Sequence, residues 1–276
     1  MSIKKGDIYG FVGKNGAGKT TLIRIISGLI NADEGDFSLL GIDSKDKRID
    51  LVRKKVCTMV ESPAIYPDLT ARDNLKMQCM ITGKDFNCID ELLSFVDLSH
   101  TGKKKAKDFS LGMRQRLGIA ISLVNEPEIM LLDEPTNGLD PEGIQQIRRL
   151  LLKMHAEKAV TILISSHILS ELSLFATRYG FIDKGCIVKE ATPEEIKIAT
   201  EENCYLEADD ITMAEDILRS LGYDVYPSDN GLRLQHDIDL MKVCGEFAKN
   251  GIRLTKHICH NIDLEQYFME LIGEGV

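Results

Sequence analysis

The sequence predicts an α/β fold in which a mostly parallel sheet is flanked by helices, and three observations support this. Strand-like and helix-like segments alternate from Asp7 to about Lys189, a pattern typical of parallel sheets with helices on both faces. Residues 129–132 are a continuous apolar run and residues 160–164 a largely apolar one, as expected of strands buried on both faces. Polar residues follow directly after these runs, where open α/β sheets bind their ligands.

A glycine-rich turn follows the first strand. Residues 13–20 (GKNGAGKT) fit the pattern G-x-x-x-x-G-K-[ST], between the apolar run 8–12 and a helix-like segment 20–26. In this pattern backbone N–H groups converge on phosphate oxygens at a helix N-terminus. Lys19 would reach the β- and γ-phosphates of a nucleotide, and the Thr20 hydroxyl would hold Mg²⁺. The predicted nucleotide-binding residues of this turn are Gly13, Asn15, Gly16, Ala17, Gly18, Lys19, Thr20 and Thr21.

Two adjacent carboxylates end the apolar run 129–132. Asp133 and Glu134 would lie at the C-terminal end of a buried strand, on the ligand-binding edge of the sheet. Asp133 is placed to orient Mg²⁺, directly or through water, and Glu134 to polarise the water that attacks the γ-phosphate. By itself such a pair would cap a solvated loop; together with a phosphate-binding turn it indicates a catalytic site.

Residues 109–116 (FSLGMRQR) resemble the LSGGQ signature motif of the ATP-binding subunits of ABC transporters. Three signature positions depart from the consensus, and Ser110 and Gly112 match it. These two residues supply a hydroxyl and an open backbone at a helix N-terminus, which can face a second γ-phosphate. Without the other motifs, Ser110 would be interpreted as an ordinary helix cap.

Two further motifs follow in the order of that family. Residues 138–141 (GLDP) resemble the D-loop, which contains Asp140, and residues 165–167 (SSH) resemble the switch-histidine motif. The resemblance implies a P-loop NTPase fold of ABC type that binds ATP and Mg²⁺. It also implies that Glu134, His167 and Lys19 are catalytic, and that His167 donates to the γ-phosphate.

The position after the predicted strand 56–60 departs from the usual family pattern. ABC ATPases usually place there a glutamine that touches Mg²⁺ and the membrane partner, whereas this chain has Glu61. A glutamate resembles the bacitracin-resistance and lantibiotic-immunity branch, which exports peptide antibiotics. Glu61 therefore joins Thr20 and Asp133 as a predicted metal ligand, and the alternative that it merely offers one more oxygen stays open.

Three classes of protein compete. The resemblance favours an ABC exporter subunit that serves a polytopic membrane permease. Two copies, or one copy and a related ATPase subunit, would then bind ATP head to tail, because Ser110 and Gly112 cannot easily reach their own phosphate-binding turn. A non-transport ABC ATPase with a regulatory C-terminal domain is the second class. A regulatory binder without turnover is the third class. The intact residues argue against it; they are Lys19, Asp133, Glu134 and His167.

Composition narrows the choice further. The formal net charge of −9 argues against a nucleic-acid partner. No apolar run approaches the about 18–20 residues of a membrane helix, and no signal peptide opens the chain. We therefore expect a protein that is soluble when isolated and that reaches the cytoplasmic face of the membrane through its permease. Seven scattered cysteines without a C-x-x-C pair favour reduced thiols over a disulfide framework.

The 276 residues allow one large and one small domain. We expect an ABC ATPase domain over residues 1–200, with its helical subdomain at about 68–112. Residues 201–276 are expected to form a small α+β domain of βαββαβ order, as in ferredoxin-like folds. Only residues 1–12 precede the phosphate-binding turn, where the family usually has a β subdomain with an adenine-stacking aromatic residue. We expect either that this adenine platform is lacking or that the sequence starts inside a longer protein.

Overall fold

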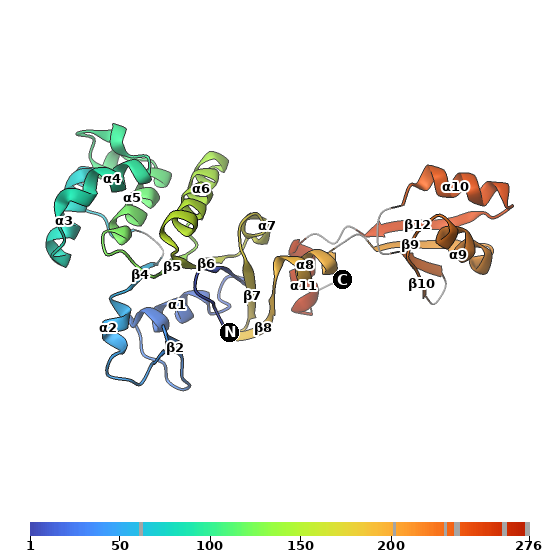
Figure 1. The fold of residues 1–276 in the computed structure, drawn as a ribbon, viewed down its shortest axis with the longest axis horizontal. Helices are drawn as coiled ribbons and strands as arrows, with labels where there is room; N and C mark the ends of the chain where they lie inside the picture. Colours follow the sequence, from blue (N-terminus) through green and yellow to red (C-terminus); the bar gives the residue numbers. More distant parts are fainter. Residues whose placement is uncertain (61–62, 201–202, 229–230, 235–237, 261–263, 274–276) are drawn as a thin grey trace. The chain divides into compact units, whose positions relative to one another are not determined.

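The computed structural model describes residues 1–60, 63–200, 203–228, 231–234, 238–260 and 264–273. The chain forms two compact units, Met1–Pro193 and Glu194–Val276, which Figure 1 colours from blue to yellow and from orange to red. Each unit has its own sheet and its own buried core, and each is described by itself.

The first unit is built on a six-stranded sheet. Its strand order is β4 (Val56–Met59), β5 (Ile129–Asp133), β6 (Thr161–Ser166), β1 (Ile8–Val12), β7 (Arg178–Asp183) and β8 (Cys186–Ala191). All neighbouring strands are parallel except β7 and β8, so the predicted mostly parallel sheet is confirmed. Because β5, β6 and β1 are parallel neighbours, the residues that follow their carboxyl ends meet at one edge of the sheet.

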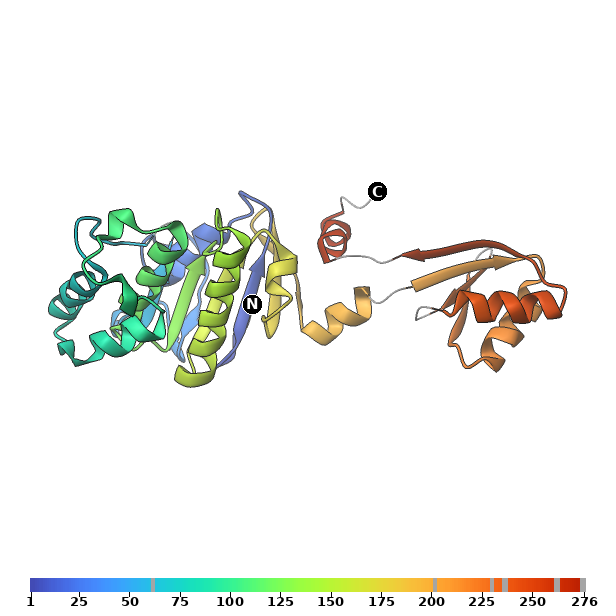
Figure 2. The same cartoon turned by 90° about the horizontal axis from the view of Figure 1, so that it is seen from above.

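Helices cover this sheet. Helix α1 (Lys19–Ser27) follows β1, and its Ile23 packs with Phe11 of β1 and Leu131 of β5. Helix α6 (Pro141–Lys158) buries Ile147, Leu151 and Met154, and Figure 2 shows it in yellow-green along the sheet. The smaller elements of this unit are β2 (Ser38–Leu39), β3 (Ile42–Asp43), α2 (Ile49–Arg53) and α7 (Leu169–Leu172).

A group of helices lies between β4 and β5 in the sequence. It contains α3 (Ala71–Thr82), α4 (Ile89–Phe95) and α5 (Leu111–Leu123), with short 3₁₀ turns at Phe86–Cys88, Ser99–Thr101 and Ala106–Asp108. Thr70 caps α3 by accepting a hydrogen bond from the Asp73 N–H at 3.1 Å. The buried Arg116 of α5 donates to the carbonyl oxygens of Val96 and Asp97 at 3.0 and 2.9 Å. A cation at these last carbonyls stabilises the end of α4 and joins it to α5.

The second unit has a four-stranded antiparallel sheet with the order β10 (Val225–Ser228), β11 (Gly231–Leu234), β9 (Asn203–Ala208) and β12 (Leu254–His260). Its helices are α8 (Pro193–Thr200), α9 (Ile211–Ser220), α10 (Leu240–Lys249) and α11 (Leu264–Leu271). Leu218 of α9 and Phe247 of α10 pack with Leu206 of β9 in its core. From β9 to β12 the element order is βαββαβ; the assignment to the ferredoxin-like fold stays a prediction.

One expectation about the cysteines is wrong. Cys204 is disulfide-bonded, although the scattered spacing favoured reduced thiols throughout. Cys204 lies on β9, directly opposite Cys259 of β12 in the antiparallel register. The two positions are 55 residues apart in the sequence, so only the strand pairing brings their backbones together.

Candidate active site

The phosphate-binding turn has a backbone that only glycine can follow at several positions. Gly16 and Gly18 have φ angles of +80° and +108°, a left-handed region that is costly for other residues. A Cβ atom at Gly13 would lie 2.6 Å from Ile182 Cγ2 and from the Ile182 carbonyl oxygen. Gly18 begins α1 without a side-chain cap, and the first turn of α1 carries no acidic residue. These backbone donors therefore suit an anion, as the sequence predicted.

Lys19 lies inside the turn. Its side chain is only 6 % exposed, and Nζ donates to the carbonyl oxygens of Gly13 and Lys14 at 2.5 and 3.3 Å. Nζ also lies 3.1 Å from Oε1 of Glu134. The structure thus brings two predicted catalytic residues into one ion pair. Because the ammonium group is held between the turn and Glu134, a phosphate in the turn would meet a preplaced positive charge.

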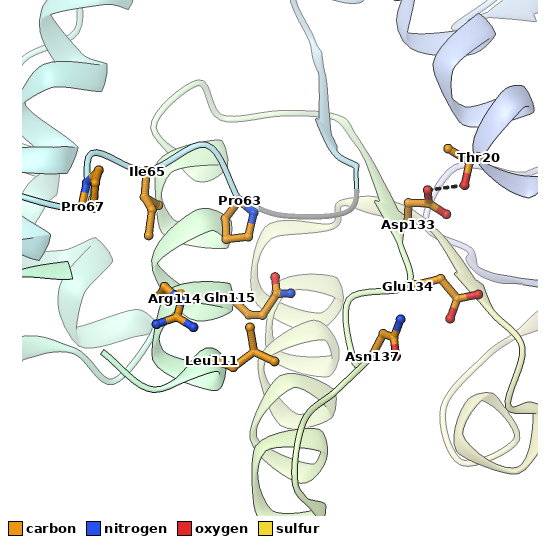
Figure 3. Close-up of a pocket in the computed structure, with 10 residues that line it drawn as sticks. All are labelled: Thr20, Pro63, Ile65, Pro67, Leu111, Arg114, Gln115, Asp133, Glu134 and Asn137. Atoms are coloured by element: carbon orange, nitrogen blue, oxygen red, sulfur yellow. Dashed lines mark hydrogen bonds between the residues drawn. The ribbon is translucent and has the colours of Figure 1, made fainter. Parts of the chain in front are cut away.

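The predicted metal ligands Thr20 and Asp133 are in contact. The Thr20 hydroxyl donates to Asp133 Oδ2 at 2.6 Å, as drawn in Figure 3, and Ser165 Oγ donates to Asp133 Oδ1 at 2.6 Å. Asp133 is 3 % exposed. A hydroxyl and a buried carboxylate are hard oxygen donors, so these residues fit Mg²⁺. Glu61, the third predicted ligand, lies outside the described residues.

Glu134 lies between Lys19 and His167. Its Oε2 is 2.7 Å from Nδ1 of His167, while its Oε1 faces Lys19. The backbone of Glu134 has a φ of +49°, which is strained for a residue with a side chain. Its N–H is held by the Ser165 hydroxyl at 2.9 Å and by the Ser165 carbonyl oxygen at 3.2 Å. One carboxylate thus contacts both Lys19 and His167.

The signature and D-loop residues meet at a different place. Ser110, Gly112 and Asp140 line a surface hollow between the starts of α5 and α6, which shares Leu111 with the cavity beside Asp133. The Ser110 hydroxyl accepts from the Met113 N–H at 3.3 Å, and Asp140 Oδ1 accepts from the Gly143 N–H at 2.9 Å. Both side chains therefore cap helices, and the structure brings neither into the lining of the cavity that contains Thr20.

A cavity of about 550 Å³ opens beside the metal ligands (Figure 3). Its lining residues are Thr20, Pro63, Ile65, Pro67, Leu111, Arg114, Gln115, Asp133, Glu134 and Asn137. The sequence did not single out Gln115, Asn137 or Pro63 as site residues, and it did not predict that Ser165 holds Asp133. Gln115 and Ser165 lie inside motifs quoted above, and Asn137 lies directly before one. This was the only signal in the sequence that could have found them.

Comparison with known proteins identifies the family. Residues 1–137 match the family model described as "ABC transporter". The bacitracin transport ATP-binding protein BcrA of Bacillus licheniformis is 39 % identical over 281 residues, covering 100 % of this chain and 91 % of that protein. This chain belongs to the ABC transporter ATP-binding family. The lantibiotic transport ATP-binding protein SrtF of Streptococcus pyogenes is 45 % identical over 190 residues. This match covers 69 % of this ABC protein and 81 % of SrtF.

Solved structures agree with this membership. The ATP-binding cassette MJ0796, solved as a dimer in a post-hydrolysis state with ADP and Pi, superposes with a TM-score of 0.62 at 26 % identity. The match covers 70 % of this ABC protein and 88 % of MJ0796. As a member of the family, the protein binds and hydrolyses ATP, in agreement with the geometry at Lys19 and Glu134. Within the described part of the chain, no helix is long and apolar enough to cross a membrane.

Proposed function

We propose that this ABC ATPase powers a separate polytopic permease that exports peptide antibiotics of the bacitracin or lantibiotic kind, at the cytoplasmic face of the membrane. The observation that carries the proposal is the similarity to BcrA, which extends over 100 % of the chain and so includes the second unit. The glutamate at position 61 also supports the proposal, because a glutamate there resembles the pattern of the same branch. A non-transport ABC ATPase is the alternative, and no described contact favours it.

In the proposed mechanism Glu134 is the general base. It orients the attacking water and accepts its proton, because its carboxylate is held by strained backbone between Lys19 and His167. When ATP binds, Lys19 exchanges its ion pair with Glu134 for one with the phosphates, and His167 donates a hydrogen bond to the γ-phosphate. Mg²⁺, when bound by Thr20 and Asp133, would neutralise charge on the phosphates.

We further propose that two copies, or one copy and a related subunit, complete each other's sites head to tail. Ser110, Gly112 and Asp140 line a surface hollow that is open to solvent, so they can meet a nucleotide bound by another subunit. The N-terminus of α5 would then offer backbone donors to its γ-phosphate. The dimeric form of MJ0796 supports this arrangement by analogy.

The test is a Glu134→Gln variant, placed in the host with its permease. We expect the variant to bind ATP and co-purify with a polytopic membrane subunit, while turnover falls by about 10²–10⁴-fold and the host becomes sensitive to a peptide antibiotic. Glu157→Gln is the matched control, because Glu157 is an exposed residue of α6 away from the site. Near-normal hydrolysis by Glu134→Gln would contradict the general-base role. The transport proposal fails if no membrane subunit co-purifies or if sensitivity to peptide antibiotics is unchanged.

A further inference from the structure

The segments that carry Glu134 and His167 are joined by hydrogen bonds on both sides of the contact between these two side chains. Glu134 follows β5, and His167 follows β6, its parallel neighbour. At the strand ends Ser165 holds the Glu134 N–H, and Glu134 Oε2 lies 2.7 Å from His167 Nδ1. Further along both segments, the Thr136 hydroxyl donates to Oε2 of Glu171 at 2.8 Å. The contact between Glu134 and His167 therefore lies between two other cross-links of the same segments.

Glu171 lies on α7, the short helix that begins two residues after His167. Apolar packing already holds this helix on the sheet, because Leu169 and Leu172 are buried and Leu172 packs against Gly10 of β1. Glu171 itself is half-buried, and a carboxylate taken out of water needs a partner to offset its lost hydration. Its hydrogen bond with Thr136 therefore does something that the leucines do not, since it fixes α7 to the neighbouring segment.

This hydrogen bond lies outside the cavity beside Asp133. Thr136 and Glu171 line a separate hollow of about 250 Å³ between α6 and α7, together with Ile144 and Arg148 of α6. In the described part of the chain, the lining of the cavity beside Asp133 includes neither partner of the bond. The bond therefore acts on hydrolysis through the two segments that it joins, and not by touching the nucleotide.

We propose that Glu171 is a positioning residue for ATP hydrolysis. By accepting the Thr136 hydrogen bond, its carboxylate holds the segment with His167 against the segment with Glu134. The side chains of His167 and Glu134 are partly exposed and lie beyond the strand ends, so cross-links of this kind set their mutual distance. In enzymes, a displacement of about 1 Å caused away from the chemistry lowers the rate by up to about 10²-fold. The proposal rests on the proposed roles of Glu134 and His167 and is independent of the transported substrate.

Two other roles of Glu171 would have different consequences. If its hydrogen bond only stabilised α7, loss of the bond would lower the unfolding temperature and leave kcat unchanged. If its negative charge were what mattered, the neutral Glu171→Gln would be as impaired as Glu171→Ala. A positioning role requires the acceptor oxygen and not the charge, because the amide oxygen of glutamine also accepts a hydrogen bond from a hydroxyl.

The experiment removes the hydrogen bond from either side, which guards against poor folding of one variant. Glu171→Ala, Thr136→Val, the double variant and Glu171→Gln are compared with the wild type by kcat, the ATP dissociation constant and thermal unfolding. We expect kcat to fall by about tenfold in both single variants that lose the bond, with an unchanged ATP dissociation constant. The double variant should fall no further, because both changes remove the same bond. Glu171→Gln should keep kcat within about threefold of the wild type.

Thr70→Val is the matched control. Thr70 also donates its hydroxyl to a carboxylate, Asp73 Oδ2 at 2.7 Å, but this pair lies at the start of α3. In the described part of the chain, neither residue of this pair lines the cavity beside Asp133. We expect Thr70→Val to lower the unfolding temperature as Thr136→Val does and to keep the wild-type kcat. Loss of stability alone would then not explain slower hydrolysis.

The outcomes separate these roles. An unchanged kcat in Thr136→Val overturns the proposal, and so do multiplied losses in the double variant or a Glu171→Gln variant as slow as Glu171→Ala. The proposal also fails if Thr70→Val slows hydrolysis as much as Thr136→Val. Glu134→Gln tests the general-base role separately, because near-normal hydrolysis by that variant contradicts the role of Glu134 whatever the variants of Thr136 and Glu171 show.

Discussion

A methyl group added to Gly118 is expected to destabilise the first unit, although alanine normally stabilises a helix relative to glycine. Gly118 is a buried position of α5, and an added Cβ would overlap the Pro63 ring and lie 3.2 Å from Met59 Sδ. Carbon atoms normally pack at about 3.5–4.0 Å, so the proline has to move by about 1 Å or more. Pro63 lines the cavity beside Asp133, so the change should also reach the site.

Two opposing terms set the magnitude. Alanine is favoured over glycine inside a helix by about 1 kcal/mol, whereas overpacking of a close-packed core costs about 1–3 kcal/mol. The net effect of Gly118→Ala is therefore a loss of about 1 kcal/mol. For a unit of this size, such a loss lowers the unfolding temperature by about 2–4 °C.

Gly245→Ala is the matched control. Gly245 lies inside α10, and a Cβ there would have no neighbour within 4 Å. Only the helix-propensity term remains, so this variant should gain about 0.8–1 kcal/mol. Because the two units need not unfold together, stability is measured by amide hydrogen exchange resolved for α5 and α10. The reasoning is refuted if Gly118→Ala protects α5 as much as Gly245→Ala protects α10.

Two further predictions concern single hydroxyl groups. Ser165→Ala removes the hydrogen bonds to Asp133 Oδ1 and to the Glu134 N–H. Because a lost bond to a charged group is worth about 1.5–3 kcal/mol, steady-state kcat should fall by about tenfold or more. An unchanged kcat would show that Ser165 does not hold the site. The hydrogen bond from Thr70 lowers the pKa of Asp73 below 3.8, so this carboxylate stabilises the fold above about pH 4 and loses that contribution as the pH falls through its folded-state pKa. In Thr70→Ala an NMR titration should find the Asp73 pKa raised toward 3.8, and α3 should lose less stability in acid. An unmoved pKa would show that the Thr70 hydroxyl does not lower it.

The sequence was sufficient for the phosphate-binding turn and for the strand that carries the carboxylates. Both depend on local constraints: Gly16 and Gly18 need φ values open to glycine, and a continuous apolar run predicts a strand buried on both faces. Because parallel strands end at the same edge, the sequence order also placed Asp133 on the ligand-binding side. The family resemblance, drawn from the same motifs, agrees with the comparisons.

Contacts between distant segments were decided by the tertiary structure. Ser165 holds Asp133 only because β6 pairs with β5 in a register that sets these residues opposite each other. The disulfide at Cys204 could not be predicted either, since its spacing to any other cysteine is uninformative.

The same division applies to Glu171. Its place shortly after His167 was visible in the sequence, but its hydrogen bond with Thr136 depends on the pairing of β5 with β6. Patterns in a sequence report local conformation and burial, because these depend on near neighbours and on periodicity. Hydrogen bonding of a buried group depends on atoms brought together by the fold, so only the tertiary structure decides whether a buried polar side chain finds a partner.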